Sequence, residues 1–361
     1  MNSQQLSKVE IRGYKSIADC NIDLNNLNVL IGSNGSGKSN FISVFKFLQE
    51  IIRKNMSLEV NRLGGANRLL YNGRKTTDSI VFRFFFGDNY YGMKLIPTDD
   101  DRLIFEDEFF GYMPYGYKGS ISKGHSESLW DKGAKNRTDL FIQPVLAGVK
   151  WRVYHFHDTS VNAKVKQAHY IGNNEEFMSD AGNIAAFLYR IREEYPTHYN
   201  EIVNHVRLVA PYFDDFVLRG KGDNISLEWK QRGCEDIFNA SQFSDGTLRF
   251  ICLMTLLLQP ADLQPATIII DEPELGLHPY AITLLAETMR SISEYKQIIV
   301  STQSVELLNE FDVEDIIVVD RSECGSSFKR LDANELKVWI EDDYTMGELW
   351  KKNILGGRLS R

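Results

Sequence analysis

The sequence predicts an α/β fold with a mostly parallel central sheet, an antiparallel β lobe and an α/β insertion. From about residue 240 onward, helical patterns alternate with short, continuously apolar strands, which is typical of a parallel sheet covered on both faces. Residues 80–109 are instead rich in aromatic and branched residues and contain the turn Gly87-Asp88-Asn89, which favours an antiparallel meander. A chain of 361 residues that is 43% hydrophobic has room for about two domains, or for one domain with a large insertion.

The expected elements follow from the periodicity of apolar residues along the chain. Short runs bounded by polar turns predict strands at 9–11, 21–24, 27–31, 80–86, 90–96 and 102–109. Apolar residues at 41, 44, 45 and 48 predict a helix after residue 39. The region 151–171 returns to strand-like sequence.

The second half of the chain is predicted to be richer in helices. Residues 182–209 favour two helices with a break at Pro196, because proline ends or kinks a helix. Residues 216–218 and 225–229 resemble a hairpin. Further helices are expected at 247–258 and 280–292, buried strands at 267–270, 297–300 and 316–319, and a docking helix within 344–357.

These elements suggest three segments. Residues 1–86 would form an N-terminal lobe, residues 87–240 an insertion of β-structure and helices that acts as a lid or partner region, and residues 241–361 a C-terminal lobe. No heptad pattern is long enough for a coiled-coil arm.

Residues 110–137 are dense in Gly, Ser, Tyr and Lys, and apolar periodicity stops there. Composition favours a solvated loop. The alternative is a surface for nucleic acid or a partner, because basic and aromatic residues alternate in it. Those residues are Lys118, Lys123, Lys132, Lys135, Arg137, Tyr115, Tyr117 and Trp130.

The motif with the clearest chemistry lies at residues 32–39, which read G-S-N-G-S-G-K-S directly after an apolar strand. A phosphate loop needs a strand before it, glycines that let the backbone curl, and a helix whose N-terminus faces the anion. We expect Lys38 to bridge the β- and γ-phosphates and Ser39 to hold Mg²⁺. The residues expected to bind the nucleotide here are Asn34, Gly35, Ser36, Gly37, Lys38, Ser39 and Asn40.

Two acids end the expected strand at 267–270. A buried parallel strand delivers the residues at its carboxyl end to the crevice in which ligands bind. We therefore expect Asp271 to hold Mg²⁺ and Glu272 to orient or deprotonate the attacking water. An acidic turn after a core strand is the alternative, which the upstream phosphate loop disfavours.

A second small-residue loop, Ser244-Asp245-Gly246-Thr247, opens the helix expected at 247–258. Such a helix N-terminus attracts an anion. Because the first loop already accounts for the phosphates, this one needs a separate explanation.

Other features exclude several protein classes. No apolar run reaches the ~18–20 residues of a membrane span, and no signal peptide is visible at the N-terminus. The four cysteines are scattered, which suggests neither a metal site nor a disulfide framework and favours the cytoplasm. A net charge of −8 argues against a surface that is basic throughout. His155 and His157 would face one side of a strand, but without a third ligand a structural role is favoured over metal binding.

The order of these motifs resembles ATP-binding-cassette (ABC) ATPases, and within them the RecF/SMC-like branch. Within that branch it more closely resembles stand-alone ATPases related to the OLD family and to phage-defence ATPases, including retron- and abortive-infection-associated ones. The segments that carry it are residues 9–17, 32–40, 243–247, 271–279, 300–304 and 347–358, with looser matches at 154–159 and 180–183.

The resemblance implies that two subunits sandwich two ATP molecules with Mg²⁺. Ser244 and Gly246 would contact the γ-phosphate bound by the other subunit, so a homodimer or higher homo-oligomer is expected. Gln303 stands where the family's switch histidine usually lies; glutamine can hydrogen-bond a phosphate or water but cannot be cationic, so hydrolysis is expected to be slow. The family's glutamine loop is not placed. Lys15 and Ser16 are weaker candidates for phosphate sensing.

The leading hypothesis is therefore an ATP-hydrolysing molecular switch with catalytic residues Lys38, Glu272 and Gln303. It would gate double-stranded DNA or a separate effector, a nuclease or a toxin, in phage defence or DNA maintenance, without a membrane partner. No nuclease motif is evident in this chain. The alternatives are an ATP-bound scaffold with little turnover and, less favoured, the ATPase subunit of a transporter.

Overall fold

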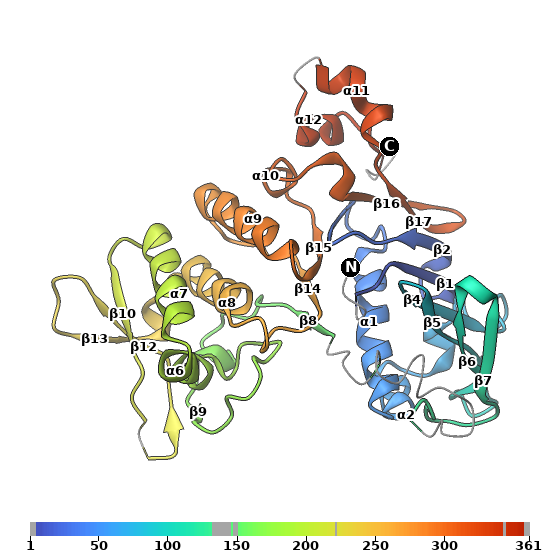
Figure 1. Cartoon of the computed structure of the whole chain (residues 1–361), viewed down its shortest axis with the longest axis horizontal. Helices are drawn as coiled ribbons and strands as arrows, with labels where there is room; N and C mark the ends of the chain where they lie inside the picture. The colour runs from blue at the N-terminus through green and yellow to red at the C-terminus, as the bar shows by residue number, and fades with distance from the viewer. Residues whose placement is uncertain (1–4, 132–145, 147–150, 221, 342–343, 357–361) are drawn as a thin grey trace. The chain divides into compact units, whose positions relative to one another are not determined.

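The computed structural model describes residues 5–131, 146, 151–220, 222–341 and 344–356, apart from the side chains of 338, 340 and 341. The chain forms two compact units (Figure 1). Unit 1 comprises 1–152, 266–269 and 293–361, and unit 2 comprises 153–265 and 270–292.

Unit 1 contains an antiparallel sheet in the order β2-β1-β4-β5-β6-β7. Its strands are β1 (Lys8–Tyr14), β2 (Ile17–Asp23), β4 (Ile80–Phe86), β5 (Asn89–Pro97), β6 (Leu103–Tyr112) and β7 (Tyr117–Ser122). The predicted meander is confirmed, because Phe84 pairs with Tyr91 and Tyr91 with Phe110.

The expectation of a solvated loop at 110–137 is wrong for its first part. β6 runs on to Tyr112, and after the short 3₁₀ turn η1 (Met113–Tyr115) the chain returns as β7, with Tyr112 paired to Tyr117. Backbone hydrogen bonds to β6 compensate for the weak apolar pattern of β7, whose side chains are largely exposed. Residues 132–137 lie outside the described residues.

The segment after β7 is held by a buried carboxylate. Glu108 is fully buried and accepts hydrogen bonds from Tyr91 Oη at 2.5 Å and from the Leu129 amide at 3.0 Å, and it lies 2.8 Å from His125 Nε2. Trp130 Nε1 then donates to the carbonyl of Ile52 at 2.9 Å. This segment is therefore fastened to the end of the first helix of the chain.

The other sheet of unit 1 carries the candidate site. Its order is β17-β16-β3-β15-β14-β8, and the chain passes between the two units within β14 and β8. The strands are β3 (Leu27–Ile31), β8 (Arg152–Tyr154), β14 (Thr267–Asp271), β15 (Gln297–Thr302), β16 (Ile316–Ser322) and β17 (Gly325–Arg330). β3 pairs in parallel with both β15 and β16, whereas β17 is antiparallel to β16.

Helix α1 (Lys38–Ile52) lies beside the strands of unit 1 (Figure 1). Its aromatic side chains contact both sheets of that unit. On one side, the ring of Phe47 lies 6.1 Å from Tyr14 and 6.2 Å from Phe82, both in the antiparallel sheet. On the other, the ring of Phe41 lies 5.1 Å from Phe328 of β17. The helix that follows the phosphate loop is thus fixed from two sides. The short helices α2 (Met56–Arg62) and α3 (Ala66–Leu69) follow it.

The C-terminal part of unit 1 packs on the site-bearing sheet. It consists of α10 (Val305–Leu308), η5 (Val313–Asp315), α11 (Ala333–Glu341) and α12 (Met346–Lys351). Leu349 of α12 is fully buried in a cluster that includes Ile31 and Leu308. The predicted docking helix is confirmed.

Unit 2 is built around helices α6 (Ile184–Glu194), α7 (Pro196–Val209), α8 (Asp245–Leu258) and α9 (Pro279–Ser293), and Ser293 itself belongs to unit 1. The predicted break at Pro196 is confirmed, because this residue begins α7. The short strands are β9 (His169–Tyr170), β10 (Phe213–Val217), β11 (Asn224–Ile225), β12 (Glu228–Gln231) and β13 (Ile237–Asn239), and the 3₁₀ turns are η3 (Lys164–Lys166) and η4 (Ala240–Gln242).

Two expectations for unit 2 need correction. Phe216 pairs with Trp229 as predicted, but Ile225 pairs with His169 of β9 instead of continuing the hairpin. The strand-like region 151–171 forms only β8 and β9 and is otherwise irregular. Both differences arise because short apolar runs find their partners through tertiary contacts that periodicity does not encode.

The α/β fold with a largely parallel central sheet and an antiparallel lobe is confirmed. Within the described ranges, no helix is sufficiently long and apolar to span a bilayer.

Candidate nucleotide-binding site

The phosphate loop of unit 1 leaves β3 at Ile31 and enters α1 at Lys38. Gly37 lies at the N-cap with a φ of 119°, a conformation that side-chain-bearing residues rarely adopt. A Cβ at this position would lie 2.7 Å from Cβ of Ser326 in β17. The loop therefore curls against β17 in a way that only glycine allows.

The loop points polar groups inward. Lys38 is 6% exposed, and its Nζ donates to the carbonyls of Gly32 at 2.6 Å and Ser33 at 3.1 Å. Ser36 Oγ is buried without a hydrogen-bond partner among the described residues, whereas Asn34 and Gly35 are exposed. A buried ammonium, an unpaired hydroxyl and the N-terminus of a 15-residue helix together suit a phosphate group.

Ser39 and Asn40 follow in the first turn of α1. The side chain of Ser39 is exposed and offers an oxygen of the kind that Mg²⁺ prefers. Asn40 Nδ2 donates to Ser16 Oγ at 2.8 Å, and Ser16 Oγ lies 2.8 Å from Ser326 Oγ. Asn40 thus ties the turn between β1 and β2 to the phosphate loop.

Lys15 lies in that same turn, with a φ of 49°. Its Nζ donates to Ser43 Oγ of α1 at 2.9 Å. Burial lowers the pKa of the Lys15 ammonium, with Glu59 opposing the shift. The turn therefore places a partly desolvated cation beside the helix that begins at the phosphate loop.

Strand register places Gln303 near this loop. Thr302, the last residue of β15, pairs in parallel with Ile31, the last residue of β3. Gln303 and Gly32 consequently leave the sheet at the same edge, because the ends of neighbouring parallel strands meet there. Ser304 then caps α10, its Oγ accepting from the Leu307 amide at 3.1 Å.

In unit 2, Ser244 and Asp245 are exposed at the start of α8. Ser244 caps the helix, with its Oγ accepting from the Thr247 amide at 3.1 Å. The preceding residue, Phe243, stacks on Trp229 at 4.4 Å, which anchors the loop to the three-stranded sheet. The loop at 243–247, called the signature loop below, is therefore held in place from both ends.

The signature loop also contacts the loop that follows the acidic strand. A Cβ on Gly246 would overlap the carbonyl oxygen of Gly276. Any larger residue at position 246 would push these two loops apart. Glycine is needed here because two backbones approach closely.

The acidic residues end β14. Asp271 and Glu272 are both half-buried, and Glu272 has a φ of 46°, which is uncommon for a residue with a side chain. His157 Nε2 donates to the carbonyl of Asp271 at 3.0 Å. The pairing of His157 with a backbone carbonyl gives it a defined structural contact, and the described residues contain no group of three or more metal-binding side chains.

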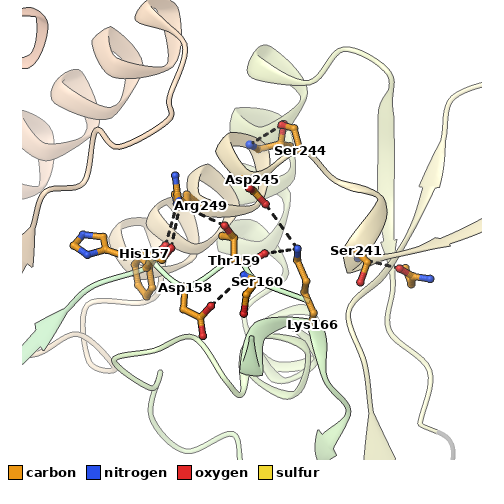
Figure 2. Close-up of polar contacts among 12 residues, drawn as sticks. His157, Asp158, Thr159, Ser160, Lys166, Ser241, Ser244, Asp245 and Arg249 are labelled. Carbon is orange, nitrogen blue, oxygen red and sulfur yellow. Dashed lines mark hydrogen bonds and ion pairs between the residues drawn. The ribbon is translucent and has the colours of Figure 1, made fainter. Parts of the chain in front are cut away.

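Lys166 contacts the signature loop through Asp245, and Arg249 follows that loop in α8 (Figure 2). Arg249 donates to the carbonyls of Phe156 at 3.2 Å, His157 at 3.0 Å and Leu275 at 2.9 Å. Lys166, whose side chain is only 9% exposed, donates to the Thr159 carbonyl at 2.5 Å and lies 3.7 Å from Asp245 Oδ1.

The structure thus groups the predicted residues into two sets. Unit 1 brings the phosphate loop together with Gln303, and unit 2 brings Ser244 and Gly246 together with the loop after Asp271 and Glu272. Sequence reasoning missed Arg249, Lys166 and the contact of His157. The sequence signal was weak: two histidines lie in the looser match at 154–159, and Arg249 lies two residues beyond the match at 243–247, and neither position predicts the contacts that these residues make.

Two family models match the sequence. A model described as an AAA ATPase domain matches residues 5–107. A second model, described as an AAA domain and as an AbiEii toxin of a type IV toxin–antitoxin system, matches residues 148–309. The first range contains the phosphate loop, and the second contains the signature loop and the acidic strand. Among curated proteins, no match was found.

Solved structures of SMC heads share the fold. An SMC head bound to the C-winged helix domain of ScpA has a TM-score of 0.56 at 15% identity, covering 92% of this chain and 99% of that chain. An SMC head with an extended coiled coil, bound to the C-terminal domain of ScpA derived from Pyrococcus furiosus, has a TM-score of 0.53 at 15% identity and covers 94% and 99%. An SMC head from Pyrococcus yayanosii has a TM-score of 0.52 at 11% identity and also covers 94% and 99%.

Proposed function

We propose that this chain works as an ATP-driven molecular switch, because ATPase family models match two parts of it and its fold is similar to that of SMC heads. One observation carries the proposal. The chain holds a phosphate loop suited to an anion and, in its other unit, a signature loop whose Ser244 and Asp245 are exposed. ATP would act as a switch by binding one conformation or assembly more tightly than the other.

In this proposal, the phosphate loop binds the nucleotide through its backbone amides, Ser36 and Lys38. The Lys38 ammonium would move from the loop carbonyls to the phosphate oxygens, which carry more negative charge. Bound Mg²⁺ would offset phosphate charge, and we propose Ser39 and Asp271 as its ligands because both offer oxygen atoms.

The signature loop would complete the site of a second copy of the chain. Ser244 is an exposed residue at a helix N-terminus, with its Oγ 2.8 Å from Thr247 Oγ1. Gly246 is half-buried and lies close to the next loop. Both features suit a phosphate presented by another subunit. We therefore propose that ATP joins two copies of this chain.

Glu272 is our candidate for orienting or deprotonating the attacking water, and Gln303 for hydrogen-bonding that water or the γ-phosphate. Glutamine provides no positive charge, so we expect slow turnover. The presence of glutamine at position 303, where the family usually has a histidine, also supports a second candidate function. In that case the chain would be an ATP-held scaffold that hydrolyses little ATP without its partner.

We further propose that the switch controls a separate effector, a nuclease or a toxin, in phage defence. The support is the description of the family model at 148–309, which names a toxin–antitoxin system. Double-stranded DNA as a partner, and DNA maintenance as the role, are the alternatives that the experiment below separates.

The test compares the wild-type protein with Lys38→Ala and Glu272→Gln. We expect calorimetry to show ATP binding in the wild type and Glu272→Gln but not in Lys38→Ala. We expect light scattering to show that ATP doubles the mass of Glu272→Gln, because slow hydrolysis preserves the closed state. ATP binding that survives Lys38→Ala would refute the phosphate loop, and an unchanged mass would refute ATP-driven dimerisation.

Turnover measurements distinguish the remaining candidates. Turnover that double-stranded DNA stimulates in the wild type, and that Glu272→Gln abolishes, would identify a DNA-responsive ATPase. Negligible turnover with intact ATP binding would favour the scaffold. DNA binding should also weaken steeply with salt if phosphate contacts carry it.

A further inference from the structure

Arg249 lies one turn into α8 and joins three segments of unit 2 through its guanidinium (Figure 2). Nε donates to the Phe156 carbonyl at 3.2 Å, and Nη2 donates to the His157 carbonyl at 3.0 Å and to Thr159 Oγ1 at 3.3 Å. Nη1 donates to the Leu275 carbonyl at 2.9 Å. One side chain therefore ties α8 to the segment 156–159 and to the loop after the acidic strand.

The segment 156–159 is itself tied to the end of β14. The carbonyl of His157 accepts from Arg249, while Nε2 of the same residue donates to the carbonyl of Asp271 at 3.0 Å. The connection from α8 thus reaches the acidic residues by two routes. One passes through His157 to Asp271, and the other passes through Leu275, which lies three residues beyond Glu272.

Gly276 lies in close contact with both Arg249 and Gly246. A Cβ added to Gly276 would lie 2.6 Å from Arg249 Nη1, and a Cβ added to Gly246 would overlap the Gly276 carbonyl. The planar guanidinium presents its donors in a fixed fork, which an ammonium cannot reproduce. A shift of the signature loop would therefore move the 271–276 loop as well, because Gly246 lies close to Gly276 and Gly276 lies close to Arg249.

We infer that Arg249 is a positioning residue that couples the signature loop to Asp271 and Glu272. This inference rests on the proposed function, in which the signature loop serves the nucleotide of one subunit and the acidic residues serve that of the other. Arg249 would then make each nucleotide site sensitive to occupation of its neighbour. Its action is indirect, because it contacts backbone carbonyls and one hydroxyl.

The first experiment needs no nucleotide. We expect Arg249→Lys to speed amide hydrogen exchange both at 244–248 and at 272–277 in the unliganded protein. Arg207→Lys is the matched control, because Arg207 also lies in unit 2 and its Nε and Nη2 donate to a backbone carbonyl, that of Asp214, at 2.9 and 2.6 Å. Faster exchange at only one of the two segments would overturn the coupling, whether or not the protein binds ATP.

The second experiment separates positioning from general stability. We expect Arg249→Lys to leave the Kd for ATP and the KM nearly unchanged, to lower kcat, and to weaken ATP-driven dimerisation by about tenfold, a typical strength for coupling between sites. Arg207→Lys should change none of these. If Arg249→Lys has the same kcat and the same dimerisation as the wild type, the inference is wrong. If the wild type does not bind ATP, the proposed function is refuted, and the exchange experiment alone tests whether Arg249 couples the two loops.

A double-mutant cycle guards against misfolding. His157→Phe keeps a ring of similar size but removes the donor to the Asp271 carbonyl. If Arg249 acts through His157, the two substitutions together should lower kcat less than the product of their separate effects. Fully independent effects would refute the route through His157, and matching far-ultraviolet circular dichroism and thermal midpoints would show that the variants are folded.

Discussion

Replacement of Gly37 by alanine tests whether β17 shapes the phosphate loop. The added Cβ would lie 2.7 Å from Ser326 Cβ and 3.1 Å from Ser16 Oγ, and closer still to Ser326 Oγ. Carbon atoms do not approach other heavy atoms to 2.7 Å without a shift. Gly37 also has a φ of 119°, which disfavours a side chain irrespective of the space around it.

The cost has two parts. A side chain in the left-handed region costs roughly 1–2 kcal/mol, and forcing an extra carbon into packed surroundings costs about 1–3 kcal/mol. Alanine also reduces the conformational entropy of the unfolded chain, which stabilises the folded state by about 0.4–1 kcal/mol and offsets part of this cost. We therefore expect Gly37→Ala to lower the free energy of unfolding by about 1–5 kcal/mol.

Gly35→Ala is the matched control. Gly35 also has a positive φ, of 79°, but a Cβ there would meet no heavy atom within 4 Å. Only the backbone cost and the unfolded-state effect remain, so we expect a loss of about 0–1.6 kcal/mol. Each variant adds one methyl group to the same loop of the wild-type protein. The difference between their losses of stability therefore separates contact with β17 from backbone strain.

Urea unfolding followed by tryptophan fluorescence measures these losses. Trp130, Trp151, Trp339 and Trp350 belong to unit 1, whereas Trp229 belongs to unit 2, so the signal reports mainly on the unit that holds the loop. ATP titration by calorimetry should show weaker binding for Gly37→Ala than for Gly35→Ala. Equal losses of stability in the two variants would refute the reasoning.

A rescue experiment sharpens the result. Ser326→Gly removes the two closest atoms that the new methyl group would meet, Cβ and Oγ of Ser326, at the cost of the 2.8 Å contact between Ser16 Oγ and Ser326 Oγ. The double variant Gly37→Ala/Ser326→Gly should therefore lose less stability than the sum of the single variants. Strict additivity would show that the two residues do not contact each other.

Two further predictions concern stability elsewhere in unit 1. Leu349→Ala should lower the free energy of unfolding by about 2–5 kcal/mol in the same urea assay, because Leu349 is fully buried, and a loss below about 1 kcal/mol would show that α12 is not docked. Burial, with Asp312 adding to it, raises the pKa of Asp315 from 3.8 to about 6. The folded state then retains this proton longer than the unfolded state, so stability is lost as pH rises from about 4 to about 6. Asp315→Asn should therefore gain stability relative to the wild type over that range, and a difference that does not change with pH would contradict this.

Local motifs allowed much of the fold to be predicted. The strand before the phosphate loop was expected at 27–31 and lies at Leu27–Ile31, because a continuous apolar run followed by glycines encodes its own ends. The helix break at Pro196 is equally local, since proline lacks an amide hydrogen. The roles of Lys38, Ser244, Asp271, Glu272 and Gln303 remain predictions.

Partner choice could not be predicted. β7 has too weak an apolar pattern to be recognised as a strand, yet it pairs with β6, and β11 pairs with β9, which lies more than fifty residues earlier in the sequence. These pairings depend on which edges the rest of the fold leaves available. Strand propensity carries little information about that choice.

Three motifs can be recognised without any structure: the phosphate loop, the acidic strand and the second small-residue loop, because each is a short run whose spacing is chemically meaningful. The surroundings of these motifs depend on how the chain folds. Gly37 lies against Ser326, which is 289 positions further along the chain, and Arg249 reaches carbonyls on both sides of it in sequence. Such contacts depend on the packing of whole strands and helices, whereas a motif depends only on neighbouring residues.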